Sequence, residues 1–126
     1  MSFDRAQNPG QNPAQPGAGE TLCPLAELAD PGAKGFHYRV GDAIFAGFIV
    51  RQGERVHGYV DSCPHAGWPL SSGGDRFLTR EGDRILCAGH GAVFRIDDGA
   101  VLFGPCDRGL TPWPVEVGSD GMVRTS

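Results

Sequence analysis

Short runs in which apolar and polar residues alternate, each bounded by turn residues, constrain the fold of this chain most. Residues 36–40 (FHYRV) alternate strictly, residues 43–51 (AIFAGFIVR) form an apolar run of strand length, and residues 55–62 (RVHGYVDS) run back after a turn. A period of two places successive side chains on opposite faces of a β-strand. Each run is therefore predicted to be a strand, with turns at GD and QGE between them.

The second half of the chain continues this pattern. A short strand is predicted within residues 81–87, a hairpin over residues 92–104 with DG at its tip, and two final strands within residues 111–117 and 121–126. The chain contains 20 Gly and 10 Pro, which favour tight turns, and no stretch has a convincing helical period. The sequence therefore predicts an all-β fold, an antiparallel sandwich or barrel.

Length and charge exclude several classes of protein. The chain has 126 residues, of which 40% are hydrophobic, and this suits one domain with a modest core. Its formal net charge of -4 argues against nucleic-acid binding, since nucleic-acid-binding domains are usually basic. No apolar run approaches the ~20 residues of a membrane helix, and the N-terminus lacks the apolar core of a signal peptide. We therefore expect no nucleic-acid or membrane partner and a cytoplasmic location.

The first 19 residues differ in composition from the rest. They are rich in Pro, Gly, Gln and Asn and offer almost no apolar side chain to bury. Such segments cannot offset the entropy of ordering. We therefore expect residues 1–19 to be a disordered tail and residues 20–126 to form the domain.

Two short stretches each pair one cysteine with one histidine. The first is CPH at residues 63–65, and the second is CAGH at residues 87–90, with 21 residues between them. Thiolate and imidazole are ligands of iron and zinc. A zinc finger usually takes two cysteines from one turn and two histidines from another, whereas here each stretch carries a mixed pair.

With these motifs the chain resembles Rieske iron-sulfur proteins, from about Leu22 to Val117. The resemblance rests on CPH, on CAGHG, on the hairpin AVFRIDDG that follows it, and on GP at residues 104–105 followed by LTPWPVEV. It implies a Rieske-like antiparallel β-sandwich or barrel, with a small cluster-binding subdomain of two loops.

The resemblance also implies one [2Fe-2S] cluster per chain and assigns its ligands. Cys63 and Cys87 would hold the inner iron, and His65 and His90 the outer iron. Two ferric ions, two sulfides and two thiolates sum to zero charge, whereas four thiolates would leave the cluster at minus two. An electron enters a neutral centre more easily, so the potential should exceed that of plant-type ferredoxins.

The resemblance places eight further residues beside the cluster, namely Gly67, Trp68, Gly89, Gly91, Ala92, Phe94, Gly104 and Pro105. Glycines there let backbone N–H groups approach the sulfides, and the Gly104-Pro105 turn resembles the loop that covers the cluster.

Two departures from the family pattern indicate its low-potential, soluble ferredoxin branch. Respiratory-chain members carry a disulfide between the two loops, where this chain has Trp68 and Gly89. High-potential members place hydroxyls at the positions of Ala92 and Phe94, which cannot donate. The segment between the two loops is also a few residues longer than the resemblance to oxygenase ferredoxins implies, and DRFLTREGD is interpreted as the insertion.

The remaining candidates have ordinary structural interpretations. Cys23 and Cys106 are interpreted as structural thiols, and Trp113 as a core residue. His37 and His57 lie on strand patterns without a partner cysteine, so we expect both at the surface.

The sequence therefore predicts an electron-transfer protein, not an enzyme. It would carry single electrons from a reductase to a terminal oxygenase or another oxidoreductase, without a small-molecule substrate of its own. Three alternatives stay open: a small Rieske subunit of a larger, nitrite-reductase-like complex, a structural zinc module of the Cys2His2 type, and an iron or redox sensor.

Overall fold

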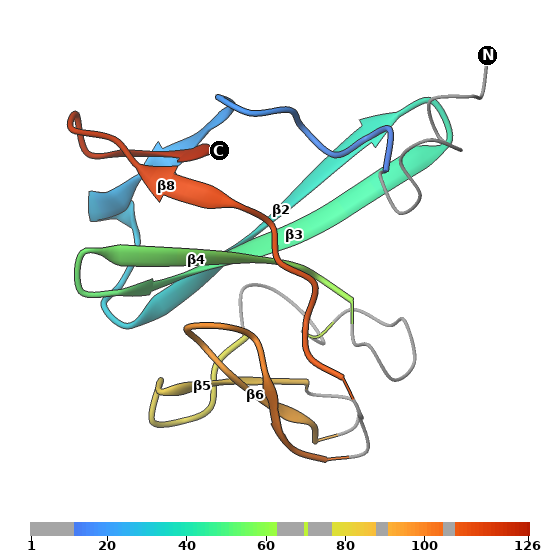
Figure 1. Cartoon of the computed structure of the whole chain (residues 1–126). Coiled ribbons are helices and arrows are strands. Elements are labelled where there is room, and N and C mark those ends of the chain that lie inside the picture. Colours follow the sequence, from blue (N-terminus) through green and yellow to red (C-terminus); the bar gives the residue numbers. More distant parts are fainter. Residues whose placement is uncertain (1–11, 63–69, 71–76, 88–90, 105–107) are drawn as a thin grey trace.

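A computed structural model describes residues 12–62, 70, 77–87, 91–104 and 108–126 of the chain. These residues form an all-β, antiparallel structure, as the sequence predicts (Figure 1). The described helical structure is one 3-10 turn, η1 (Leu25–Glu27). Among the described residues, no helix has the length and apolar character needed to cross a bilayer.

The described strands form three sheets of three strands each. The first sheet has the order β1 (Thr21–Pro24), β9 (Met122–Thr125), β8 (Val115–Val117). The second is a meander of β2 (Gly32–Val40), β3 (Ala43–Gln52) and β4 (Arg55–Val60). The third, which we call the small sheet, has the order β5 (Arg84–Leu86), β6 (Val93–Arg95), β7 (Val101–Phe103).

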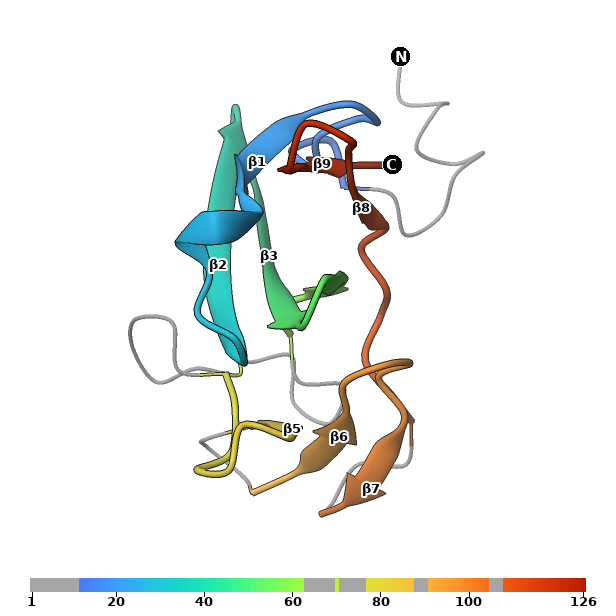
Figure 2. The same ribbon diagram turned by 90° about the vertical axis from the view of Figure 1, so that its left-hand side faces the viewer.

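The first two sheets make the larger part of the molecule, which we call the base. They meet where β4 lies beside β8, and the backbone of Trp113 there donates a hydrogen bond to the Gly58 carbonyl at 2.8 Å. The small sheet lies at the other end of the molecule from the C-terminus (Figure 2). This division matches the predicted sandwich or barrel with a separate small subdomain.

Strand β3 contributes side chains to two cores, because successive side chains of a strand point to opposite faces of the sheet. Phe48 and Val50 enter a core shared with the small sheet, whereas Phe45 and Ile49 enter a second core inside the base. A central strand buried on both faces needs an apolar run without alternation of polarity, and AIFAGFIV is such a run. The second core surrounds Trp113, which is almost fully buried, as predicted.

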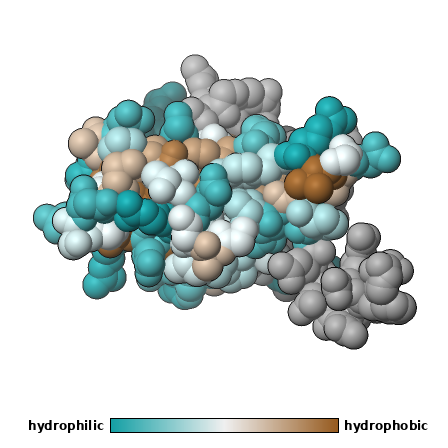
Figure 3. Space-filling model, turned by 90° about the horizontal axis from the view of Figure 1, so that it is seen from above, coloured by the Kyte–Doolittle hydropathy of each residue, from teal (hydrophilic) through white to brown (hydrophobic). Residues whose placement is uncertain are grey.

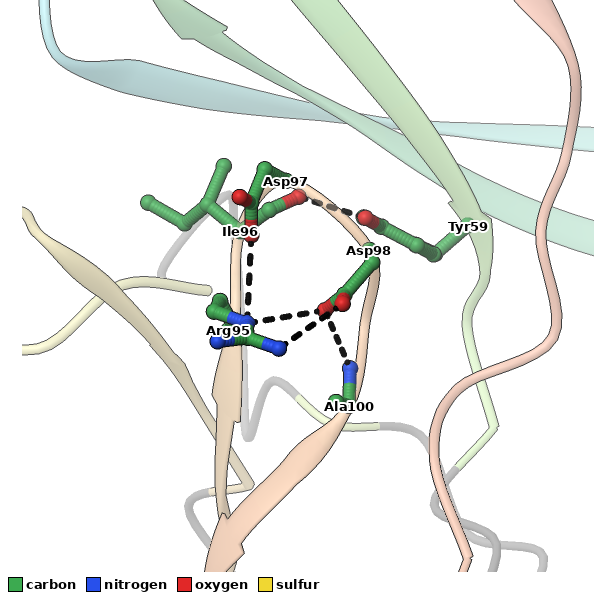
Figure 4. Close-up of polar contacts among 6 residues, drawn as sticks. All are labelled: Tyr59, Arg95, Ile96, Asp97, Asp98 and Ala100. Carbon is green, nitrogen blue, oxygen red and sulfur yellow. Dashed lines mark hydrogen bonds and ion pairs between the residues drawn. The ribbon is translucent and has the colours of Figure 1, made fainter.

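Tyr59 links the base to the small sheet. Its hydroxyl donates a hydrogen bond of 2.5 Å to the carbonyl of Ile96 in the β6–β7 turn (Figure 4). Burial, with a smaller contribution from Asp98 and Asp97, raises the pKa of the Tyr59 hydroxyl to about 12. The buried Tyr59 hydroxyl therefore stays protonated, and able to donate this hydrogen bond, throughout the physiological pH range.

The β6–β7 hairpin turns at the predicted place. Asp98 accepts the backbone N–H of Ala100 at 2.9 Å and pairs with Arg95 at 2.9 Å (Figure 4). Gly99 follows with a φ of 73°, a conformation that glycine adopts without strain. The ring of Tyr59 lies so close to Gly99 that a Cβ there would come within 2.7 Å of it.

The segment before β1 differs from expectation. The sequence predicts a disordered tail over residues 1–19, but residues 12–19 contact the base. Ala14 is buried in the core around Trp113, and the Thr125 hydroxyl donates to the Gly17 carbonyl at 2.6 Å. Composition could not predict this contact, because the gap that the small side chain of Ala14 fills exists only once the base has folded. Residues 1–11 lie outside the described residues, and their disorder stays a prediction.

The end of the base away from the small sheet is mainly polar. Its described surface is hydrophilic or neutral over most of the face, with small separate apolar areas (Figure 3). Two exposed apolar side chains, Val40 and Ile44, belong to the β2–β3 hairpin. Single exposed apolar residues are usual on protein surfaces.

We expect the segment of residues 12–19 to contribute to stability, in contrast to residues 1–11. Removing residues 1–11 should leave the thermal midpoint unchanged, whereas removing residues 1–19 should lower it by several degrees. Ala14→Asp in the full chain should cost at least about 2 kcal/mol, because it buries a carboxylate. Thermal unfolding of the three variants checks this, and equal midpoints for both truncations would contradict it.

We expect Tyr59→Phe to cost about 1–2 kcal/mol, because the Ile96 carbonyl loses its buried donor. The folded pKa of about 12 exceeds the usual value of 10. The difference between wild type and variant should therefore be constant below about pH 10 and shrink as the pH rises towards 12, since only the unfolded tyrosine ionises there. Chemical unfolding at several pH values measures it. Tyr38→Phe, at a half-buried tyrosine beside Trp113, is the control and should change stability by less than about 0.5 kcal/mol.

Candidate metal centre

The structure describes part of the predicted site. Five of the residues predicted at or beside the cluster are described: Cys87, Gly91, Ala92, Phe94 and Gly104. The others lie outside the described residues: Cys63, His65, His90, Gly67, Trp68, Gly89 and Pro105. Cys106, which was interpreted as a structural thiol, also lies outside them. The ligand assignment therefore stays a prediction. The structure shows how the flanks of the first ligand segment (residues 63–69) and the second (residues 87–91) are held.

The second ligand segment is closed by backbone hydrogen bonds. Cys87 follows β5 directly, and its N–H donates to the Ala92 carbonyl at 2.8 Å. The Gly91 N–H donates to the Cys87 carbonyl, also at 2.8 Å. Gly91 has a φ of 76°, which suits glycine. Strands β5 and β6 therefore present Cys87 at the end of a tight hairpin, with its side chain fully buried.

The first ligand segment is closed by a side chain. Asp61, just after β4, accepts the backbone N–H of Leu70 on its Oδ1 at 2.8 Å. Burial raises the pKa of the Asp61 carboxyl, while the Leu70 N–H and nearby His37 oppose that rise. The two ends of the segment that carries Cys63 and His65 are thus joined.

The flanks of both segments meet in one core. Leu70 and Cys87 are fully buried in the core that the small sheet shares with the base. Phe77 stacks on Phe48 of β3 with ring centroids 4.3 Å apart and planes 4° apart, and its carbonyl accepts the N–H of Leu86 at 2.9 Å. The structure therefore brings together Leu70, which follows the first motif in the sequence, and Cys87, which begins the second.

The second segment is followed by apolar residues without hydroxyl groups. Ala92 and Phe94 are both fully buried. Gly104 lies directly against Ala92, because a Cβ at Gly104 would come within 2.5 Å of the Ala92 Cα. Its φ of 109° also favours glycine. The start of the predicted covering turn thus packs closely on the end of the second ligand segment.

These surroundings suit a buried group without net charge. Leu70, Ala92 and Phe94 offer apolar surface, which disfavours a charged centre. A [2Fe-2S] cluster held by two thiolates and two imidazoles is neutral when oxidised, so the residues present fit it. Within the part of the chain that the structure describes, which includes Cys87 but not the other predicted ligands, no group of three or more His, Cys, Asp or Glu side chains comes together.

The other predicted residues lie away from this region. Cys23 is buried in β1, and desolvation raises the pKa of its thiol, which agrees with a structural role. His37 is exposed, as expected. His57 is partly exposed, in agreement with the expected surface position, and desolvation lowers its pKa. His57 lines an open hollow of about 340 Å³ between β4 and the β6–β7 turn.

Sequence reasoning missed two polar residues beside the predicted site. Tyr59, near the end of β4, binds the β6–β7 turn, and Asp61, just after β4, binds the N–H of Leu70. The signal available for Asp61 was its place two residues before Cys63. The partner of Tyr59 is 37 residues away in the sequence, so no local pattern could have indicated it.

Comparison with known proteins agrees with this description. The family model of the Rieske [2Fe-2S] domain matches residues 21–114. Ferredoxin CarAc from Metapseudomonas resinovorans is 32% identical to this chain over 96 residues, which are 76% of this chain and 82% of that protein.

Solved structures share the fold. A chain in the complex of reduced oxygenase and oxidised ferredoxin of carbazole 1,9a-dioxygenase is 28% identical, with a TM-score of 0.62, and the match covers 84% of this chain and 99% of that one. The ferredoxin of carbazole 1,9a-dioxygenase from Nocardioides aromaticivorans IC177 is 22% identical, with a TM-score of 0.63 and coverage of 84% and 94%. Together, the family model and these relatives show that the chain belongs to the Rieske [2Fe-2S] domain family, among the Rieske-type ferredoxins.

Proposed function

We propose that this chain is a one-electron carrier that passes electrons from a reductase to a terminal oxygenase. The observation that carries the proposal is the 32% identity to a ferredoxin over three quarters of the chain. It is also supported by the 28% identity to a chain from a complex of oxygenase and ferredoxin. In this role the protein is an electron-transfer component and not a catalyst.

The proposed site contains one cluster per chain, with Cys63, Cys87, His65 and His90 as ligands. When bound, the cluster would accept and release one electron at a time. The protein's own residues would do the rest. Leu70, Ala92 and Phe94 exclude water from the buried side of the site, because all three are fully buried.

The imidazoles of His65 and His90 are proposed as the side of the site that faces a partner. In this assignment the thiolates take the buried positions, and the full burial of Cys87 supports that orientation. A partner would then receive the electron through the histidine side without displacing any residue of the shared core.

We further propose the cytoplasm as the location of the protein, with redox proteins as its partners. Cys63 and Cys87 used as thiolate ligands suit a reducing compartment, where disulfides are rare. A small-molecule substrate is not part of the proposal, since the function consists of electron transfer between proteins.

The function is tested by transfer to an acceptor. The chemically reduced protein, mixed rapidly with an oxidised Rieske-type oxygenase, should reoxidise in one phase whose rate rises with oxygenase concentration. Reoxidation at the same slow rate with and without the oxygenase would count against the proposal. Co-elution with a permanent partner subunit during purification would favour the alternative of a bound subunit.

The purified protein is expected to be red-brown and to contain about two irons and two acid-labile sulfides per chain. Cys63→Ala and Cys87→Ala should each abolish the visible spectrum, because each removes a thiolate ligand. Cys23→Ala is the matched control and should retain the spectrum, since this thiol is buried in β1 of the base. Metal analysis and absorbance check these outcomes, and one zinc without iron would contradict them.

The reduction potential is expected near the low end of the Rieske range, roughly -150 mV and not +300 mV. A hydroxyl donating to a sulfur stabilises the reduced state more, because that state has the extra negative charge. Ala92→Ser and Phe94→Tyr should therefore each raise the potential by tens of millivolts, given that about 1.4 kcal/mol corresponds to about 59 mV for one electron.

The control for these variants is Phe103→Tyr, which adds a hydroxyl to a ring that is 72% exposed on β7. It should leave the potential unchanged, since its hydroxyl is placed in solvent. Protein-film voltammetry of the wild type and the three variants decides the matter. A wild-type potential near the top of the range would refute the explanation from missing hydroxyls.

A further inference from the structure

We infer that Asp61 is a positioning residue for the cluster, which holds the first ligand segment in register with the second through its hydrogen bond to Leu70. The inference rests on the proposed assignment of Cys63 and His65 as ligands. Asp61 is not itself a ligand. Its proposed role is to set the position of the first ligand segment relative to the second, which the choice of ligands does not decide.

Asp61 is fixed at its backbone before its side chain acts. Its N–H donates to the carbonyl of Ala46 at 2.9 Å, so the residue continues the pairing of β4 with β3 beyond Val60. The position of its carboxylate is therefore set by the central strand of the base. The first ligand segment begins two residues later.

The carboxylate then fixes the point where the chain returns. Its Oδ1 accepts the Leu70 N–H at 2.8 Å, so residues 61 and 70 are held together across the segment that carries Cys63 and His65. The partly buried setting strengthens this hydrogen bond, because less water competes for the N–H. A side-chain amide oxygen at the same position could accept the same N–H.

Leu70 transmits this position to the second ligand segment. Its side chain is fully buried in the same core as Cys87 and Ala92. These two residues lie at the two ends of the turn between β5 and β6. Interiors are packed closely enough that a shift of one such side chain is felt by its neighbours. The contact between Asp61 and Leu70 therefore sets the relative position of the two ligand segments.

The two segments differ in how substitution can affect them. The described ends of the second segment are joined by backbone hydrogen bonds between Cys87, Gly91 and Ala92, which no side-chain substitution removes directly. The described ends of the first segment are joined through the side chain of Asp61. A single substitution at residue 61 can therefore loosen the first segment while the second stays closed.

Three variants separate geometry from charge. Asp61→Asn keeps an oxygen acceptor at the same position and removes the negative charge. Asp61→Glu keeps the charge and moves the acceptor by one methylene group. Asp61→Ala removes the acceptor. Each is purified as the holoprotein, and the rate of iron loss to a chelator is measured together with the electron paramagnetic resonance spectrum of the reduced cluster.

The expected results follow the position of the acceptor and not the charge. Asp61→Asn should lose iron within about twofold of the wild-type rate and keep its resonance spectrum. Asp61→Ala should lose iron at least about tenfold faster and show shifted or broadened resonances. Asp61→Glu should lie between Asn and Ala. Hydrogen exchange should rise in peptides covering residues 62–70 of Asp61→Ala and stay unchanged in peptides covering residues 84–95.

Asp98→Ala is the matched control, because Asp98 makes the same kind of contact to the N–H of Ala100 in the small sheet. It should leave iron loss and the resonance spectrum unchanged, which separates a positioning role from general weakening of that sheet. If Asp61→Ala does not yield folded protein, the comparison of Asn with Glu decides the question alone.

Two outcomes would overturn the inference. One is Asp61→Ala with the wild-type rate of iron loss and the wild-type spectrum, in a protein in which Cys63→Ala abolishes the cluster. The other is Asp61→Glu behaving as wild type while Asp61→Asn loses iron quickly, since charge and not position would then matter. A Cys63→Ala protein that retains its cluster would instead refute the ligand assignment of the proposed function.

Discussion

The core between β3 and the small sheet is the feature on which the rest of the structure depends. It stacks Phe48 of the base on Phe77 and continues to Leu70, Cys87 and Phe94. Its apolar contacts are the main stabilising force available to a sheet of three short strands, since so small a sheet has little core of its own. The same contacts bring together Leu70 and Cys87, which flank the two predicted ligand segments, so the stability of the small sheet and the position of these flanks have one physical origin.

Hydrogen bonds at the end of β4 fix relative positions that apolar packing alone does not determine. Packing alone tolerates small shifts, whereas a hydrogen bond selects a direction and a distance. Tyr59 binds the β6–β7 turn, and Asp61 binds the N–H of Leu70, which follows the first ligand segment. Because Asp61 directly follows β4 and lies two positions after Tyr59, both contacts come from the same end of the base.

The apolar character of the site also bears on its redox properties. Ala92 and Phe94 place no hydroxyl beside the second ligand segment, and Gly104 packs against Ala92 with no room for a side chain. A site with few donors favours the oxidised state, which has less negative charge to stabilise. We therefore expect a low reduction potential without any change in the ligand types of the Rieske family.

Local features of the sequence determined much of this protein. Alternation of polarity predicted the strand of residues 36–40, an apolar run of strand length predicted that of residues 43–51, and the DG turn predicted the β6–β7 hairpin, because each signal lies within a few residues. The spacing of cysteine and histidine indicated the family for the same reason. The burial of Ala14, which contradicts the expectation that residues 1–19 have nothing to bury, was decided by tertiary structure. So were the partial burial of His57 and the contacts of Tyr59 and Asp61. Each depends on a partner or a cavity that distant strands create on folding, and a gap filled by one methyl group leaves no pattern in the chain that fills it.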